Sequence, residues 1–203
     1  MNTPSFLETY QAEFQKTLDH ITVADTAGEV TFAEAVDRCV SMLTQVQQED
    51  RRTYIIGNGG SAGIAGHTAI DFWKNGGVPT QAFNDASLLT CLSNDIGFEK
   101  VFSLPVEMFA RKGDLVICIS SSGNSQNILN AAQAALDKGC VVITLSGFDP
   151  LNKLKPMGHI NFFVPAFSYG FVEVIHQYIL HVILDTKLYC HDQRDVFNKN
   201  LPK

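Results

Sequence analysis

The stretch Gly57-Asn58-Gly59-Gly60-Ser61 follows a short apolar run, Tyr54-Ile55-Ile56, and precedes a segment with helical periodicity. A strand that ends in glycines and leads into a helix forms a cradle for an anion, because glycine lets the backbone approach a ligand closely. The N-terminus of the helix adds free N–H groups and a favourable dipole. Such a turn also occurs without any ligand, so by itself it indicates the fold more strongly than the function.

A second loop of the same kind strengthens the interpretation. Ser120-Ser121-Ser122-Gly123-Asn124-Ser125 follows the apolar run Leu115-Val116-Ile117-Cys118-Ile119. In α/β proteins, ligands bind beyond the carboxyl ends of the strands, so two such loops predict one ligand shared between them. Neither loop contains Lys or Arg. A bound phosphate is therefore expected to be held by hydroxyl groups and backbone amides.

From residue 53 onward, short apolar runs alternate with segments of helical periodicity. The apolar runs cover residues 53–57, 80–84, 114–120, 141–146 and 160–165. The helical segments between them cover residues 62–74, 86–92, 104–111 and 125–138. This alternation predicts an α/β fold, in which an open parallel sheet is covered by helices on both faces.

Three further segments have apolar residues at helical spacing: residues 4–22, a helix that Thr31 caps and that runs to a polar break at 47–52, and residues 170–190. The last is apolar on most faces, so we expect part of it to lie in an oligomer interface. We predict a single domain over residues 1–203, with residues 1–50 as a helical packing and oligomerisation segment. The expected assembly is a homo-oligomer, specifically a tetramer.

Composition excludes several classes of protein. The net charge is −6 and no run of Lys and Arg is long enough for a nucleic-acid-binding stripe. No apolar stretch reaches the roughly 20 residues of a membrane span, and the start has no secretory signal pattern. The five cysteines are scattered without metal-site spacing, as expected for small buried side chains in a reducing compartment. We expect a cytoplasmic protein that binds neither nucleic acid nor membrane.

Two helical segments carry ionisable side chains at one-turn spacing. His67 and Asp71 are four residues apart, and Glu173, Gln177 and His181 form a row four residues apart. Imidazoles and carboxylates in such positions can bind zinc or divide general-acid and general-base work. The same residues also fit a surface ion pair and a hydrogen-bonded core histidine, and spacing alone does not separate these alternatives.

Together these blocks resemble the sugar isomerase (SIS) domain family, and within it the phosphoheptose isomerases. The resemblance covers nearly the whole chain and depends on the order of five blocks: Gly57–Ser61, His67 with Asp71, Ser93–Asp95, Ile119–Ser125, and Glu173 with His181. It implies a flavodoxin-like parallel sheet and a homotetramer with active sites between subunits. The implied reaction is the aldose–ketose isomerisation of sedoheptulose 7-phosphate to D-glycero-D-manno-heptose 7-phosphate.

The resemblance also implies a role for each block. Substrate contacts are implied for Asn58, Gly59, Gly60, Ser61, Asn94, Asp95 and Glu173, and phosphate contacts for Ser120, Ser121, Ser122 and Ser125. Zinc, or another divalent metal, is implied for His67, Asp71, Glu173 and His181. In the family mechanism the carboxylate at position 71 moves a proton between the two carbons of an enediol, and His181 is its partner acid or base.

The sequence departs from the family pattern near the implied metal. Asp71 and Glu173 stand where the family has Glu and Gln, and residues 169–172 lack the usual Asp-Arg pair and are one residue shorter. Asp is one methylene shorter than Glu, which moves a carboxylate by about 1.5 Å, a displacement that can cost a catalyst heavily. These changes favour a related phosphosugar, such as a precursor of a capsule or other surface glycan.

Two alternative functions require residues that differ from those of an isomerase. The family contains non-catalytic members, including phosphosugar-sensing modules and a regulator that binds the bacterial replication initiator. That regulator lacks the acidic residue and the final histidine, whereas Asp71 and His181 are present here, which favours an enzyme. A nucleotide-dependent oxidoreductase is disfavoured, because residues 57–61 do not match G-x-G-x-x-G.

Overall fold

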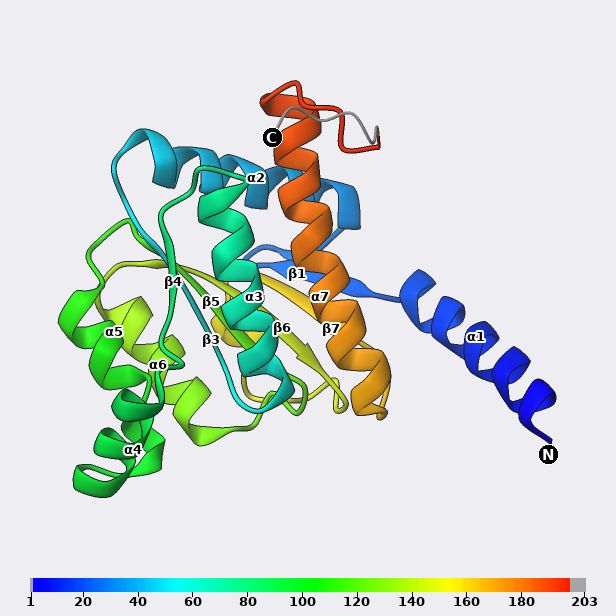
Figure 1. The fold of residues 1–203 in the computed structure, drawn as a ribbon, viewed down its shortest axis with the longest axis horizontal. Helices are drawn as coiled ribbons and strands as arrows, with labels where there is room; N and C mark the ends of the chain where they lie inside the picture. The colour runs from blue at the N-terminus through cyan, green and yellow to red at the C-terminus, as the bar shows by residue number, and fades with distance from the viewer. Residues whose placement is uncertain (1, 198–203) are drawn as a thin grey trace.

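A sheet of seven strands divides the molecule into two helical layers in the computed structural model, which describes residues 2–197 (Figure 1). The strand order across the sheet is β2-β1-β7-β6-β5-β3-β4. The strands are β1 (Thr22–Asp25), β2 (Gly28–Val30), β3 (Thr53–Gly57), β4 (Thr80–Ala82), β5 (Leu115–Ser120), β6 (Val141–Gly147) and β7 (Ile160–Val164). The five strands from β3 to β7 pair in parallel, and β3, β5 and β7 are buried along their whole length, as their apolar sequences predict.

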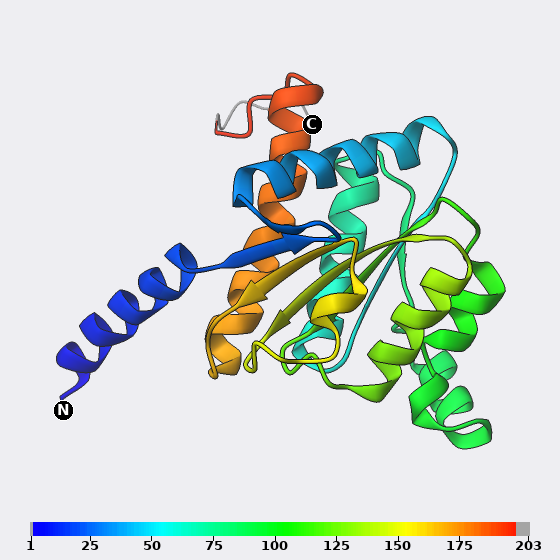
Figure 2. The same cartoon turned by 180° about the vertical axis from the view of Figure 1, so that it is seen from behind.

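Helices cover both faces of this sheet (Figures 1 and 2). They are α1 (Thr3–Asp19), α2 (Phe32–Gln48), α3 (Gly60–Lys74), α4 (Ala86–Asp95), α5 (Ser103–Phe109), α6 (Gln126–Asp137) and α7 (Tyr169–Thr186). One core cluster joins α2, α3 and α7 to the sheet, and a second joins α5 and α6 to its other face. The predicted α/β fold class is therefore confirmed, and each helix forms at the segment predicted for it.

Local chemistry explains why α2 begins where it does. Thr31 caps α2, as predicted: its hydroxyl accepts a hydrogen bond from the Glu34 backbone N–H at 3.2 Å, and the Glu34 carboxylate accepts one from the Thr31 N–H at 2.9 Å. This reciprocal pair satisfies two N–H groups that the helix leaves unpaired. The apolar residues of α2 then face the core, with Cys39 and Val40 fully buried.

The N-terminal segment is not entirely helical, which corrects the prediction for residues 1–50. Between α1 and α2, strands β1 and β2 form an antiparallel hairpin, and β1 extends the sheet by pairing antiparallel with β7. The Asp25 carboxylate closes the turn by accepting hydrogen bonds from the N–H groups of Ala27 and Gly28. Strands of four and three residues are too short to produce a clear alternation in the sequence.

Helix α1 extends away from the sheet (Figure 1). Its contacts with the body of the chain include Tyr10 and Phe14, whose rings meet Phe171 of α7 edge-on at 4.7 and 5.5 Å between centroids. Phe6 and Leu7, on the same helix, are about half exposed, at 52% and 51%. An apolar stripe left open in this way is typical of a surface that another chain covers.

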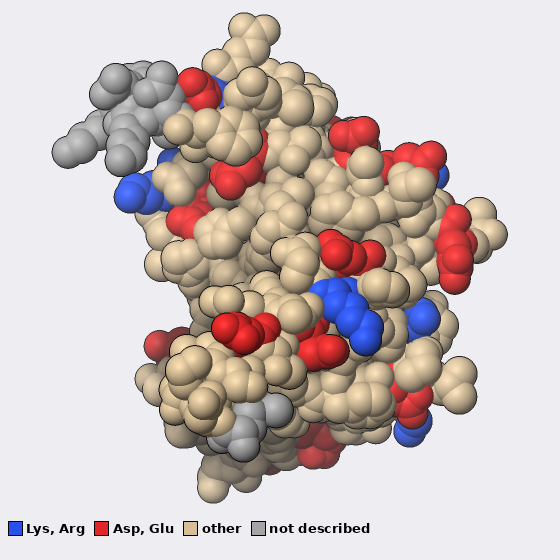
Figure 3. Space-filling model, turned by 90° about the vertical axis from the view of Figure 1, so that its right-hand side faces the viewer, with Lys and Arg blue, Asp and Glu red and all other residues tan. Residues whose placement is uncertain are grey.

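On the face shown in Figure 3, Lys and Arg side chains are few and lie apart, and Asp and Glu side chains are more numerous. Among the residues that the structure describes, no helix is both long and apolar enough to cross a membrane.

His176, a buried histidine of α7 that contacts strand β6, gives a prediction about stability. His176 is fully buried, its Nε2 lies 3.2 Å from the Ser146 carbonyl oxygen, and within the described chain its Nδ1 has no hydrogen-bond partner. Burial lowers the pKa of His176 to about 4. The unfolded chain, with an imidazole pKa of about 6.5, then binds more protons than the folded chain between these two values, so stability falls as the pH falls.

We expect acidification from pH 7 to pH 4 to cost roughly 3 kcal/mol of the free energy of unfolding through His176 alone. Urea unfolding of the wild type and of His176→Gln at several pH values measures this contribution. Carboxylates contribute to acid unfolding in both proteins, so the difference between the two slopes isolates the imidazole. Equal slopes would show that His176 does not titrate with a lowered pKa.

Candidate functional site

The two glycine- and serine-containing loops line one cavity of about 270 Å³ at the carboxyl ends of β3 and β5. Its walls are formed by Asn58, Gly59, Gly60, Ser61, Ile119, Ser120, Ser121, Ser122, Ser125, Tyr169 and Glu173. The strands that precede the loops are direct neighbours in the sheet, since β3 pairs with β5 in parallel. The expectation that both loops serve one pocket is therefore in agreement with the structure.

The serine loop presents donors to this cavity. Ser125 is the N-cap residue of α6, and its side chain makes no capping hydrogen bond, so the helix N-terminus keeps free N–H groups. The Ser121 hydroxyl is buried and has no hydrogen-bond partner in the described structure. Gly123 has φ +62°, and a Cβ at this position would overlap the Asn152 side chain. Backbone amides and hydroxyls in this arrangement suit a phosphate group.

A pair of amides fixes the two loops relative to each other. Asn58 and Asn127 each donate a side-chain N–H to the other's side-chain oxygen, at 2.9 Å in both directions. Asn58 follows β3 and Asn127 lies in the first turn of α6, so the pair connects the two walls of the cavity. The sequence analysis did not identify Asn127, because nothing in its own neighbourhood indicates that α6 lies beside the first loop.

Glu173 lies in the first turns of α7 and faces the glycine loop. A Cβ at Gly60 would overlap the Glu173 carboxylate, so only glycine allows the carboxylate to lie directly against the start of α3. Among the described residues, no Lys, Arg or His lies within ion-pair distance of Glu173, whose side chain is half-buried. The helix N-terminus at Gly60 favours a negative charge at this point.

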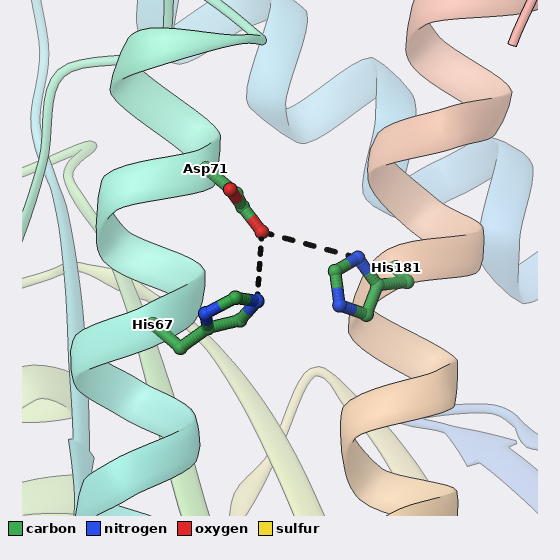
Figure 4. Close-up of side chains that lie close together, drawn as sticks. All are labelled: His67, Asp71 and His181. Carbon is green, nitrogen blue, oxygen red and sulfur yellow. Dashed lines mark ion pairs between the residues drawn. The ribbon is translucent and has the colours of Figure 1, made fainter. Parts of the chain in front are cut away.

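Three of the four residues implied as metal ligands converge further along the two helices (Figure 4). The His67 Nε2 lies 3.1 Å from the Asp71 Oδ2, and the His181 Nδ1 lies 4.0 Å from the same oxygen. Helix α3 supplies His67 and Asp71, and α7, which packs beside it, supplies His181. We call these three residues the His–Asp–His group. Two imidazoles and a carboxylate form a donor set that suits Zn²⁺.

Within this chain Glu173 lies apart from the His–Asp–His group, and its predicted role as a fourth metal ligand stays a prediction. Glu173 precedes His181 by eight residues, or about 12 Å along a helix that rises 1.5 Å per residue. The two ends of α7 therefore contact different parts of α3: Glu173 lies against Gly60, and His181 lies beside Asp71. Glu173 lines the cavity instead, as expected for a substrate contact.

Asn94 and Asp95 are also separate from the cavity in this chain. Both lie at the exposed end of α4, where the Asn94 amide donates to the Asp95 carboxylate at 2.8 Å. Cys91, one turn earlier, lies 3.5 Å from the other Asp95 oxygen. Helix α4 follows β4 at the edge of the sheet, far in the strand order from the strand that leads into α7. The implied substrate contacts of Asn94 and Asp95 stay predictions.

A further carboxylate lies near the His–Asp–His group and was missed by the sequence analysis. Asp185 follows His181 by one helical turn. Its pKa is raised, mainly by partial burial and also by the negative charge of Asp71, while His181 acts in the opposite direction. The four-residue spacing from His181 was the available signal, because it places both side chains on one face of α7.

A family model, similar sequences and a similar solved structure all relate this chain to the same family. Residues 9–147 match the family model described as SIS domain. The phosphoheptose isomerase of Helicobacter hepaticus is 39% identical over 76% of this chain and 82% of its own length, and that of Fusobacterium nucleatum is 32% identical over 89% and 92%. The solved structure of a phosphoheptose isomerase from Neisseria gonorrhoeae superposes with a TM-score of 0.78, at 27% identity, over 92% of this chain and 98% of that one.

Proposed function

Because this chain belongs to the SIS domain family, and within it to the phosphoheptose isomerases, we propose that it isomerises sedoheptulose 7-phosphate or a close relative to the corresponding aldose phosphate. The observation that carries the proposal is the placement of an anion-binding cavity and the His–Asp–His group along the same two helices, α3 and α7. The cavity suits the phosphate, and the His–Asp–His group suits the proton transfer.

The separation between the cavity and the His–Asp–His group supports a seven-carbon sugar phosphate as the substrate. The cavity wall at Glu173 and the group at His181 are eight residues apart on α7, about 12 Å along the helix axis. An extended seven-carbon chain with its phosphate is about 10 Å long, from carbon–carbon bonds of about 1.5 Å. With the phosphate at the serine loop, the carbonyl end of such a sugar approaches the His–Asp–His group.

In the proposed mechanism the chain's own residues move one proton. The phosphate is held by Ser120, Ser121, Ser122 and Ser125 with the N-terminal amides of α6. The Asp71 carboxylate removes the proton from the carbon beside the carbonyl and returns it to the neighbouring carbon. His181 exchanges a proton with the substrate oxygens, which completes the conversion through an enediol.

The donor set of the His–Asp–His group fits a divalent metal. We propose that His67, Asp71 and His181 hold Zn²⁺ or a related ion. A bound divalent ion would polarise the substrate oxygens. Imidazole nitrogens must be unprotonated to bind a metal, so occupancy is expected to decrease as the pH falls toward about 5–6.

The proposed activity can be tested directly. The purified protein is incubated in D₂O with a panel of five- to seven-carbon sugar phosphates, after chelation and again with added Zn²⁺, and aldose–ketose exchange is followed by NMR. We expect deuterium at the carbon beside the carbonyl, with a seven-carbon phosphate as the best substrate. If the wild type binds these compounds but exchanges none of them under either condition, a non-catalytic sensing module is the better description.

We also propose that the chain forms a tetramer whose interfaces cover the apolar face beside the His–Asp–His group. Ile70 and Trp73 flank Asp71 on α3 and are 51% and 52% exposed, and Val174 and Tyr178 are exposed on α7. Together with the open stripe of α1, these exposed apolar side chains are the kind of surface that an oligomer interface covers.

We expect light scattering at micromolar concentration to give the mass of four chains. Trp73→Glu and Leu7→Asp should each lower the mass, because they place a charge in a covered apolar surface. Glu8→Ala, which changes an exposed residue beside Leu7, is the matched control. A wild type that is monomeric at this concentration would contradict the proposal.

A further inference from the structure

We propose that the segment Lys187–Arg194 acts as a clasp that joins the ends of α3 and α7 and thereby positions the Asp71 carboxylate. The inference rests on the proposed role of Asp71 in the His–Asp–His group. It assigns a function to the residues that follow α7 and to Asn75 at the end of α3, and neither takes part in the mechanism described above.

The clasp is anchored by a buried ion pair. Beyond α7 the chain continues as a π-helical turn, Lys187–His191, and the Lys187 side chain is almost completely buried. Its ammonium group donates to both oxygens of Asp192, at 3.1 and 3.0 Å. A buried ammonium group is costly without a hydrogen-bonded counter-ion, so this contact keeps the chain after Asp192 close to the end of α7.

The next residues reach across to α3. The Arg194 backbone N–H donates to the Leu188 carbonyl at 2.8 Å, which fixes the direction of the segment. The Arg194 guanidinium donates to the backbone carbonyl of Asn75 at 2.8 Å. Asn75 is the C-cap residue of α3, where carbonyl groups have no partner within the helix. A cation at this end also complements the helix dipole.

Asn75 connects the clasp to Asp71 through its side chain. The Asn75 side-chain amide donates to the Asp71 Oδ1 at 3.2 Å, while the Asp71 Oδ2 faces His67 and His181. The two carboxylate oxygens thus have separate partners, and the rotation of the carboxylate is fixed. The helix ends are also close: a Cβ at Gly76 would lie 2.7 Å from the Leu184 side chain of α7.

The clasp affects the reaction rate because catalysis depends on the exact position of the Asp71 carboxylate. A displacement of about 1 Å in a reacting group can lower a rate about a hundredfold. Asp71 is held on one side by the amide of Asn75, which the clasp in turn fixes through its backbone. Loss of either contact leaves Oδ2 free to turn away from the two imidazoles. Arg194 and Asn75 are therefore positioning residues for Asp71.

The test uses Arg194→Ala and Asn75→Ala, two exposed positions where substitution should leave the fold intact. Lys74→Ala is the matched control, because it removes a positive charge at the same helix end, and Lys74 forms no ion pair with any described residue. Three quantities are measured in each protein: the ¹⁵N–¹H signals of the His67 ring without metal, the affinity for Co²⁺ from its visible absorption, and kcat and KM for the sugar phosphate.

We expect both variants to shift the His67 ring signals, to weaken Co²⁺ binding about tenfold and to lower kcat about tenfold, with KM changed less than twofold. The double variant should be no worse than Asn75→Ala, since the clasp acts through Asn75. His67 signals and Co²⁺ affinity that match those of the wild type in both variants would overturn the inference. A wild type without isomerase activity would overturn the proposed function instead, and the His67 signals would still decide the positioning.

Discussion

His181→Ala should lower kcat for the sugar phosphate about a thousandfold while leaving the fold and the oligomer nearly unchanged. The imidazole lies 4.0 Å from the Asp71 carboxylate and is partly exposed, so its removal leaves no buried cavity. General acid–base catalysis by a positioned side chain contributes roughly 10²- to 10⁴-fold, and the loss of a metal ligand adds to this. Stopped assays at saturating substrate, with Zn²⁺ in excess, measure the change.

The matched control is His20→Ala, which removes an exposed histidine at the end of α1, away from the cavity. It should retain the activity of the wild type. A His181→Ala protein that keeps more than a tenth of the wild-type kcat would contradict the assigned role. Proton transfer would then have to be assigned to the carboxylate that lines the cavity itself, that of Glu173.

Replacing Ser122 and Ser125 together by alanine should weaken sugar-phosphate binding about a hundredfold. Both residues line the cavity, and neither loop supplies a Lys or Arg to compensate for the lost hydroxyls. A hydrogen bond to a charged group contributes about 1.5–3 kcal/mol, so the loss of two gives a large effect even if the two are not additive.

Calorimetry in the His181→Ala background measures this affinity without turnover of the ligand. Ser41→Ala is the control, because Ser41 is an exposed serine on α2 whose hydroxyl only bonds to the Asp37 carbonyl. If the double variant binds the sugar phosphate as tightly as its parent, the phosphate is not held by this loop. Reduced affinity for inorganic phosphate as well would assign the loss to the phosphate end of the ligand.

Much of the fold was determined by short-range patterns that the sequence displays directly. Strand β3 has the bounds predicted for it, and α2 begins at the predicted cap, Thr31. Both depend on residues within a few positions of one another, namely a β-branched run that ends at glycine and a threonine three residues before a glutamate. The shared cavity could also be predicted, since parallel strands place their carboxyl ends at one edge of the sheet.

The sequence by itself thus determined the α/β architecture, the two loops and the candidate ionisable residues. Only the tertiary structure decided which of those residues meet. Glu173 and His181 share one face of α7, but opposite ends of that helix contact different parts of α3, so His181 joins Asp71 and Glu173 does not. The contacts of Asn127 with Asn58 and of Arg194 with Asn75 span 69 and 119 residues. Contacts of this kind arise from the packing of whole elements against each other, and no local periodicity in the chain encodes them.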